Sequence, residues 1–230
     1  MINLAQKVGQ KFVNSIFNDV HTKYDQANDA MSLFLHRKWK KDFVNMLNIN
    51  QDTTALDLAS GTGDIAKLLL KKTRNVILCD INEDMLTIAK KKINGGEFVL
   101  ADAQNLPFKN ESFNLVTCVF GIRNFQEIKK SICEVRRVLT AGGKFAIMEF
   151  MPNAENNTMN LLYQSYIKHI LPKYDLLFKN SSNSYSYLSQ SILEFQSRAN
   201  FVTLLEDNGF SVISPSIMNS TIGIFLCEKK

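Results

Sequence analysis

From residue 53 onward the sequence alternates short apolar runs with longer amphipathic runs, and no other feature constrains the fold as strongly. Strands are predicted at residues 53–59, 75–80, 97–102, 113–121 and 143–150. Runs with helical spacing separate most of them, at residues 64–72, 82–93 and 127–139. Continuously apolar strands are typically buried on both faces, and connecting helices of this length favour a parallel sheet. The sequence therefore predicts an α/β fold, in which helices cover both faces of a mostly parallel sheet.

The segment before this core also has helical spacing. Apolar residues recur at Phe12, Val13, Ile16, Phe17 and Val20, and again at Trp39, Phe43, Val44 and Leu47. Spacings of three and four residues place each set on one helix face. A helical cap, with a helix–turn–helix between the two sets, is predicted over residues 1–50.

The segment after the fifth strand is predicted to be helical at first and to end in two strands. A helix through Tyr163 to Leu171 is expected to stop at Pro172, because proline breaks the helical hydrogen bonding. Further helices are expected after the loop near residue 183 and up to Gly209, before strands at 210–217 and 220–230. Gly142 and Gly143 are expected to form a left-handed C-cap after the helix at 127–139.

Neither an internal repeat nor a linker interrupts the chain, so a single domain is predicted over residues 1–230. Its parts are a cap (1–50), a binding core (53–150), a helical insertion or substrate lid (151–198) and a final helix with strands (199–230).

The turn "SGTGD" joins the first predicted strand to a helix at the edge where open α/β sheets bind ligands. With the following residues it fits the loose dinucleotide pattern G-x-G-x-x-A, which by itself is a weak signal. Asp80 ends the second strand, where a carboxylate can accept hydrogen bonds from both ribose hydroxyls. That contact would serve NAD and S-adenosylmethionine equally well.

Two further acids favour S-adenosylmethionine. Asp57, in the first strand, could meet an ammonium group, which the methionine part of this cofactor has and NAD lacks near the turn. Asp102 could accept from an adenine amino group, and Ala103 leaves room for the ring. Each acid alone is more often a cap or loop carboxylate. Three acids at three successive strand ends suit a cationic adenosine ligand without phosphates.

Several longer stretches resemble the UbiE-type C-methyltransferases of ubiquinone and menaquinone biosynthesis. They are "IFNDVHTKYDQANDAMS", "LHRKWKK", "LDLASGTGD", "LCDINEDML", "ADAQNLPF", "FGIRN", "VLTAGGKFAIMEF" and "NSYSYLSQSI". The glycine turn and its acids are common to class I methyltransferases, whereas "KYDQANDAMS", "HRKWK" and "FGIRN" are specific to this family. The resemblance covers nearly the whole chain. It implies a Rossmann-like class I methyltransferase fold with a seven-stranded sheet and a helical N-terminal cap.

The resemblance implies that Thr62, Asp80, Asp102 and Ala103 contact S-adenosylmethionine, and that Gly61 and Gly63 let the backbone approach it. Many family members carry Asn where this chain has Asp102, a change that keeps an acceptor. Many also carry serine where this chain has Val119, so the hydroxyl contact expected there is lost.

The implied reaction is C-methylation of a polyprenylated quinol, 2-methoxy-6-polyprenyl-1,4-benzoquinol or demethylmenaquinol. Arg123 is expected to stabilise the developing phenolate or to order a water that takes the proton, because arginine itself stays protonated. Asn124 is expected to orient the ring hydroxyl. The alternative for Arg123 is a structural ion pair with an acid such as Glu149.

Other side chains have less support. Tyr24, Asp25, Tyr185 and Tyr187 could close the cofactor site or line the ring pocket, or could simply pack within the cap. His21, His36 and His169 are not expected to be bases, because none ends a strand. No cluster of metal ligands is evident, and the implied chemistry needs no metal.

Composition limits the partners and the compartment. The net charge of +5 is modest, with no long basic block, so no nucleic-acid partner is expected. The four cysteines are scattered, and three lie in apolar runs, as expected for buried thiols in a reducing compartment. No apolar run approaches the length of a membrane span, and Lys7 and Lys11 interrupt any signal-like segment near the N-terminus. A cytoplasmic protein is expected.

A prenylated substrate implies contact with the inner face of a membrane, for which the aromatic and basic segment 163–178 is a candidate. A quinone-biosynthesis complex or a homodimer is a further expectation. Three other functions remain open: a nicotinamide-dependent dehydrogenase, a methyltransferase for another small molecule or RNA, and a non-catalytic subunit of a quinone-synthesis complex.

Overall fold

The computed structural model describes residues 4–9, 11–13, 15–16, 35–152, 158–177, 183–215 and 221–230. Their strands form one sheet of seven, in the order β3-β2-β1-β4-β5-β7-β6. The strands are β1 (Ala55–Leu58), β2 (Val76–Asp80), β3 (Glu97–Leu100), β4 (Phe113–Val119), β5 (Leu139–Phe150), β6 (Phe210–Ile213) and β7 (Ile222–Lys229). β7 pairs antiparallel with both of its neighbours, β5 and β6, and all other pairs of neighbouring strands are parallel. The predicted sheet of seven mostly parallel strands is confirmed.

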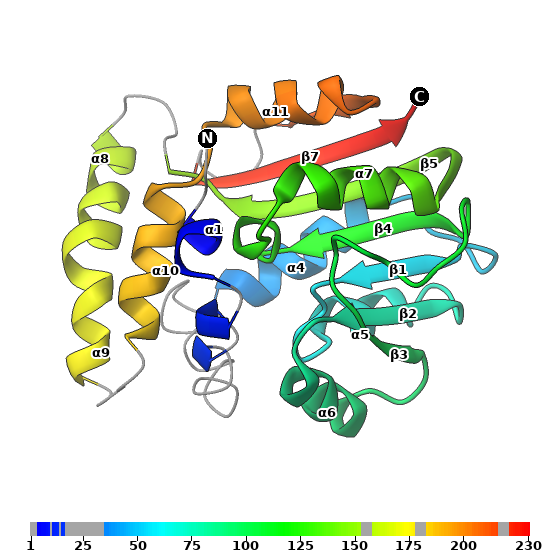
Figure 1. Cartoon of the computed structure of the whole chain (residues 1–230), viewed down its shortest axis with the longest axis horizontal. Helices are drawn as coiled ribbons and strands as arrows, with labels where there is room; N and C mark the ends of the chain where they lie inside the picture. The colour runs from blue at the N-terminus through cyan, green and yellow to red at the C-terminus, as the bar shows by residue number, and fades with distance from the viewer. Residues whose placement is uncertain are drawn as a thin grey trace.

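Helices cover both faces of this sheet (Figure 1). The longer ones are α4 (Leu35–Met46), α6 (Glu83–Lys92), α7 (Ile128–Val138), α8 (Thr158–Ser165), α10 (Ser184–Leu193) and α11 (Arg198–Asp207). The shorter ones are α1 (Leu4–Val8), α5 (Asp64–Leu69) and α9 (Tyr174–Leu177). In Figure 1, β1 and β4 point toward the side of the molecule where α1 and α10 lie. Helix α1 of the cap and helix α10 of the insertion therefore lie at the carboxyl edge of the sheet, whereas α4 covers one of its faces.

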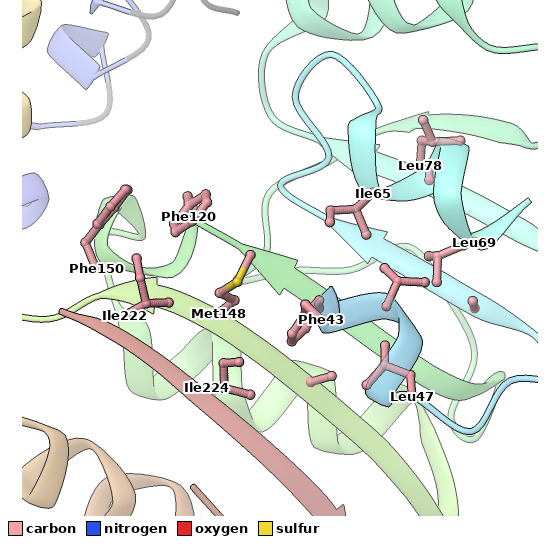
Figure 2. Packing of buried hydrophobic residues seen from close by; sticks show 14 of the residues in the cluster. Phe43, Leu47, Ile65, Leu69, Leu78, Phe120, Met148, Phe150, Ile222 and Ile224 are labelled. Atoms are coloured by element: carbon pink, nitrogen blue, oxygen red, sulfur yellow. The ribbon is translucent and has the colours of Figure 1, made fainter. Parts of the chain in front are cut away.

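The two faces of the sheet have separate cores. One joins α4, α5 and α6 to the sheet, and Figure 2 shows Phe43 and Leu47 of α4 in the same cluster as Ile65 and Leu69 of α5 and Met148 of β5. The other packs α7 and α11 on the opposite face through residues such as Ile132 and Phe201. This division follows from strands whose side chains are buried on both sides, as in β1, where all four residues are buried.

The described part of the cap is helical, and most of the residues predicted on its apolar faces are buried. Phe43, Val44 and Leu47 are buried, as the spacing of α4 predicts. Val13 and Ile16 are also buried and form a small cluster with Leu4, Ala5 and Tyr187, whereas Phe12 is 45% exposed. Phe17, Val20 and most of the expected helix–turn–helix lie outside the described residues.

Two local predictions are wrong. The helix before β5 ends at Val138 with an extended C-cap residue, Leu139, so Gly142 and Gly143 do not cap it. Gly142 has φ +67°, but it lies three residues further on, where the pairing of β4 and β5 shifts register.

Pro172 does not stop its helix either. It lies in the first turn of η3 (Leu171–Lys173), which follows the π-helix η2 (Tyr166–Ile170) and continues into α9. Proline is tolerated there because the first residues of a helical turn need no N–H donor.

Candidate active site

The carboxyl ends of the parallel strands border an open cavity of about 720 Å³. The turns after β1, β2, β3 and β4 all contribute to its wall, and Val13 of the N-terminal segment closes one side. A smaller cavity of about 370 Å³ adjoins it, because Ala59, Gly61, Val119 and Phe120 line both. The carboxyl edge of the sheet, where ligand binding was predicted, therefore borders a cavity from the turn after β3 to the turn after β4.

Asp80 holds the glycine turn in place. Its Oδ2 accepts a hydrogen bond from the N–H of Gly61 at 2.8 Å, and its Oδ1 accepts one from the N–H of Asn82 at 2.9 Å. Burial raises the pKa of Asp80 above its usual value, although these hydrogen bonds favour the charged form. The carboxylate lies in the wall of the larger cavity, where it was predicted to meet a ribose.

Asp102 and Ala103 line the same cavity just beyond β3. Both Asp102 oxygens accept from the side-chain amide of Gln104, and Oδ1 also accepts from its backbone N–H. These local bonds fix the carboxylate beside the cavity. Ala103 is 7% exposed and brings no bulk, as a flat ring beside it requires.

Asp57 is more enclosed than the sequence indicates. Its Oδ1 accepts from Thr117 Oγ1 at 2.8 Å and its Oδ2 from the N–H of Ala66 at 3.0 Å. Burial raises the pKa of Asp57 from 3.8 to about 7, against the effect of both hydrogen bonds. Its carboxylate lines the smaller cavity only, so the structure separates it from Asp102.

Thr62 also belongs to the smaller cavity. It is 4% exposed, and its Oγ1 accepts from Lys92 Nζ at 3.3 Å. Beside it, Lys40 Nζ lies 2.8 Å from Asp64 Oδ2, and Lys92 Nζ lies 3.7 Å from Asp64 Oδ1. Although burial acts the other way, the two lysines lower the pKa of Asp64 below its usual value.

The two glycines of the turn have different roles. Gly61 has φ +53° and lines both cavities, and a Cβ added there would meet nothing within 4 Å. Gly63 has φ +86° and lines neither cavity, and a Cβ there would lie 2.9 Å from Ile93 Cγ1. Gly61 therefore lets the backbone border the cavity, as predicted, whereas Gly63 lets α5 pack against the end of α6.

Arg123 and Asn124 follow β4 in the short helix η1 (Ile122–Asn124) and point in different directions. Asn124 lines the larger cavity, and its Oδ1 accepts from Tyr187 Oη at 3.0 Å. Arg123 is 7% exposed and turns into the protein. Its Nη1 pairs with Glu149 Oε1 and donates to the carbonyl of Phe120, and its Nε donates to Ser191 Oγ. The structural ion pair considered for Arg123 is therefore present.

Glu149 is fully buried at the end of β5. Burial raises its pKa, while Arg123 and the N–H of Phe150 stabilise the charged form. The guanidinium also lies 5.8 Å from the centre of the Phe150 ring, which stacks on Phe120.

Of the remaining predicted residues, some contact the site and others do not. Tyr187 contacts the site through Asn124, whereas Tyr185 packs edge-on against Tyr174 in the insertion. Val119 lines both cavities. His36 is buried within α4 and His169 is exposed on η2, and neither lines a cavity described above. Tyr24, Asp25 and His21 lie outside the described residues.

The sequence reasoning missed Lys40 and Ser60, which both line the smaller cavity. Lys40 carries a readable signal, because it occupies the apolar stripe of α4 that continues at Phe43, Val44 and Leu47. A lysine in a buried stripe needs a partner or a ligand. Ser60 gives no such signal in the sequence.

Over the described part of the chain, no three or more His, Cys, Asp or Glu side chains form a group that could hold a metal ion. Cys79, Cys118 and Cys227 are buried free thiols, as predicted, and Cys133 is exposed. None of the described helices is long and apolar enough to cross a membrane.

Comparison with known proteins agrees with the resemblance in the sequence. The model of the ubiE/COQ5 methyltransferase family matches residues 5–228. A demethylmenaquinone methyltransferase of Thermotoga maritima is 35% identical, over 94% of this chain and 96% of its own length. A ubiquinone/menaquinone biosynthesis C-methyltransferase UbiE of Rickettsia prowazekii is 38% identical, over 89% of this chain and 86% of its own.

Solved structures share the fold at much lower identity. A SAM-dependent methyltransferase of Thermotoga maritima superposes with a TM-score of 0.68 at 19% identity, over 94% of this chain and 99% of that one. The [4+2]-cyclase SpnF superposes with a TM-score of 0.69 at 12% identity, over 100% of this chain and 97% of that one. Since one of these proteins is named as a cyclase, this likeness shows the fold and not the reaction.

Proposed function

Since the chain belongs to the ubiE/COQ5 methyltransferase family, we propose that it transfers a methyl group from S-adenosylmethionine to a ring carbon of a polyprenylated quinol. The chain is a methyltransferase of the ubiquinone and menaquinone type, like the relatives above. The proposed substrates are 2-methoxy-6-polyprenyl-1,4-benzoquinol, demethylmenaquinol or both. The relatives' names include both pathways and favour neither.

One observation carries the proposal: a single cavity is lined by Asp80, Asp102 and Ala103, which end or follow β2 and β3, and by Asn124, which follows β4 on the other side of β1. Adenosine fits the part of the cavity at β2 and β3, because Asp80 can accept from ribose hydroxyls and Asp102 from an adenine amino group. Gly61 lets the backbone come close between them. A hydroxylated ring then approaches from the side of Asn124.

The cofactor supplies an electrophilic methyl group on a positively charged sulfur. The protein must align the ring carbon with it and favour loss of the ring hydroxyl proton, which raises electron density at that carbon. We assign to Asn124 the contact with the ring hydroxyl, because its Oδ1 is already fixed by Tyr187.

Arg123 is assigned the stabilisation of the developing phenolate, or the ordering of the water that accepts its proton. Arg123 precedes Asn124 in η1, its Nη1 is paired with Glu149, and it lines neither cavity. The proposed effect is therefore that of a fixed charge near the ring and not of a direct contact with it. In an apolar surrounding such fixed charges act more strongly than they do in water.

Isothermal titration with S-adenosylhomocysteine, with NAD as the parallel titrant, tests the cofactor. Binding of S-adenosylhomocysteine alone is the expected result, and binding of NAD alone would establish a dehydrogenase instead. Turnover with each quinol then tests the substrate. Binding without turnover of either quinol would favour a methyltransferase for another small molecule or a non-catalytic subunit.

We further assign membrane contact to the outer face of the helical segment 158–177, which lies outward of α10 (Figure 1). Its exposed large side chains include Leu161, Leu162, Ile170 and Leu176, the last 85% exposed. Lys168 and Lys173 are exposed on the same segment. Its only acid, Asp175, is buried and accepts from the N–H groups of Tyr185 and Ser186. Exposed leucines with cationic neighbours suit an anionic lipid surface.

Liposome co-sedimentation with and without anionic lipid tests this face. The double variant Leu161→Ser/Leu176→Ser should pellet less than the unchanged protein, whereas Ile213→Ser, on the exposed side of β6, should not differ from it. Equal pelleting of all three would refute the assignment. A homodimer or a complex partner on this face would instead change the sedimentation velocity of the double variant in the absence of lipid.

A further inference from the structure

The loop between β3 and β4, residues 101–112, forms one wall of the larger cavity. Ala101, Asp102 and Ala103 line the cavity from this loop. The loop contains neither a strand nor a helix, and irregular segments of this kind are usually the more mobile parts of a fold. A side chain that recognises one group of a ligand must nevertheless be held to within about 0.5 Å. The loop therefore needs an anchor outside itself.

Glu134 and Arg137, which lie three residues apart on α7, hold this loop through its backbone. Glu134 Oε2 accepts from the N–H of Leu106 at 2.9 Å, and Arg137 Nη2 donates to the carbonyl of the same residue at 2.9 Å. Arg137 Nη1 donates to the carbonyl of Phe108 at 2.8 Å and to Asn110 Oδ1 at 3.0 Å. The loop is thus bonded to one helix at several successive points.

The two anchoring side chains also fix each other. Arg137 Nε donates to Glu134 Oε1 at 2.8 Å, and Nη2 donates to Oε2 at 2.8 Å. A fork of two parallel hydrogen bonds sets the orientation of the guanidinium as well as its position. These hydrogen bonds from Arg137 hold the pKa of Glu134 below its usual value, so the pair stays charged at neutral pH. Since α7 is packed on the sheet through Ile132 and Val135, the anchor itself has a rigid base.

A single turn links the anchor to Asp102. The N–H of Asn105 donates to the carbonyl of Asp102 at 2.9 Å, and Leu106 is the next residue. Leu106 is buried in the same core cluster as Ala103. A shift of Leu106 would therefore displace Asp102 and Ala103 with it.

We propose that Glu134 and Arg137 are positioning residues for cofactor binding, which hold Asp102 where it accepts from the adenine amino group and so set the preference for adenine. This inference rests on the proposed function, because it requires S-adenosylmethionine in the larger cavity. Neither Glu134 nor Arg137 lines that cavity, so their effect passes through the loop.

The test compares S-adenosylhomocysteine with its analogue that carries unsubstituted purine in place of adenine and so lacks only the amino group. By calorimetry the unchanged protein should bind S-adenosylhomocysteine about 10- to 100-fold more tightly, as for one hydrogen bond to a carboxylate. In Arg137→Met this ratio of affinities should fall by about 3- to 10-fold, because the loosened loop no longer fixes Asp102. Arg136→Met is the matched control, since Arg136 is exposed on the same helix and lies beside Gly209. It should keep the ratio of the unchanged protein.

A second comparison shows whether the effect passes through Asp102. Asp102→Ala should abolish the preference for adenine, and adding Arg137→Met to it should change the ratio no further. A change of the ratio by Arg137→Met that persists in the Asp102→Ala background would overturn the inference.

A merely structural role for the pair gives a different result. Arg137→Met would then lower the melting temperature and leave the ratio unchanged, which would overturn the inference. If Arg137→Met does not fold, Glu134→Gln decides, because it keeps the size of the side chain and replaces one acceptor by a donor. A fall of the ratio by about 2- to 5-fold supports the inference, and an unchanged ratio refutes it.

The unchanged protein separates this failure from failure of the proposed function. Binding of both ligands with equal affinity would refute the inference and leave the methyltransferase proposal standing. Binding of neither ligand would refute both.

Discussion

The pair formed by Arg123 and Glu149 offers the sharpest test of how the site is held together. Both side chains are buried, at 7% and 0% exposure. Glu149→Gln keeps the size of the side chain and removes its charge, so the guanidinium is left buried without a counter-charge. Breaking such a pair from one side costs about 3–5 kcal/mol. For a chain of this length the expected fall in melting temperature is about 6–20 °C.

The opposite single change should cost less. Arg123→Met leaves Glu149 in an apolar surrounding, but a carboxylate can neutralise itself by taking up a proton, and burial already raises its pKa. The double variant removes both charges and should be more stable than the sum of the single losses predicts. A coupling free energy of about 1–3 kcal/mol is expected from urea unfolding of all four proteins.

Strict additivity of the two losses would refute the ion pair as the reason for their burial. The double variant then serves a second purpose, because it is expected to fold. If it binds S-adenosylhomocysteine normally and keeps near-wild-type turnover, Arg123 has no part in the chemistry. A large fall in turnover with unchanged binding would support the assigned charge stabilisation.

Three further predictions follow from single contacts. Between pH 4 and 7 the folded protein holds a proton on Asp57 that the unfolded chain releases, so the free energy of unfolding falls as the pH rises through this window, by about 4 kcal/mol at most. Urea unfolding from pH 5 to 8 should show this fall for the unchanged protein and not for Asp57→Asn. The same fall in both proteins would refute the raised pKa. Gly63→Ala should lower the melting temperature more than Gly142→Ala does, because both glycines have positive φ and only Gly63 lacks room for a Cβ. Equal falls in melting temperature would contradict the packing role of Gly63. Tyr187→Phe should leave S-adenosylhomocysteine binding unchanged and lower quinol turnover, because Asn124 loses its hydrogen bond. Unchanged turnover would refute the proposed contact between Asn124 and the ring hydroxyl.

The sheet and the place of the binding edge were predictable because they depend on repeated patterns. Buried strands such as 75–80 are mostly apolar, and the acids Asp57, Asp80 and Asp102 at or near the ends of the first three strands mark the carboxyl edge without reference to any tertiary contact. The prediction for Asp80 is specific for the same reason, since its position follows from the strand that precedes it.

Side-chain direction was not predictable from such patterns. Arg123 and Asn124 are neighbours in a 3₁₀ turn, where successive residues point about 120° apart, so one lines the cavity and the other turns into the protein. Which one does so depends on Glu149 and Tyr187, which lie far away in the sequence. The prediction for Pro172 is wrong because proline is tolerated in the first turn of a helical segment, and the sequence does not show that such a segment begins at Leu171.

Two of the family-specific segments, together with α10, converge on the site although the sheet does not require them. A cyclase shares the same fold at 12% identity, so the strands and their glycine turn do not by themselves determine a reaction. The residues that determine the reaction must therefore lie at the carboxyl edge of the sheet, outside the shared strands. Here "HRKWK" brings Lys40 to the smaller cavity and "FGIRN" brings Asn124 to the larger one, while α10 fixes Asn124 through Tyr187. These three segments, and not the sheet, are therefore where changes should alter the substrate or the reaction while leaving the fold intact.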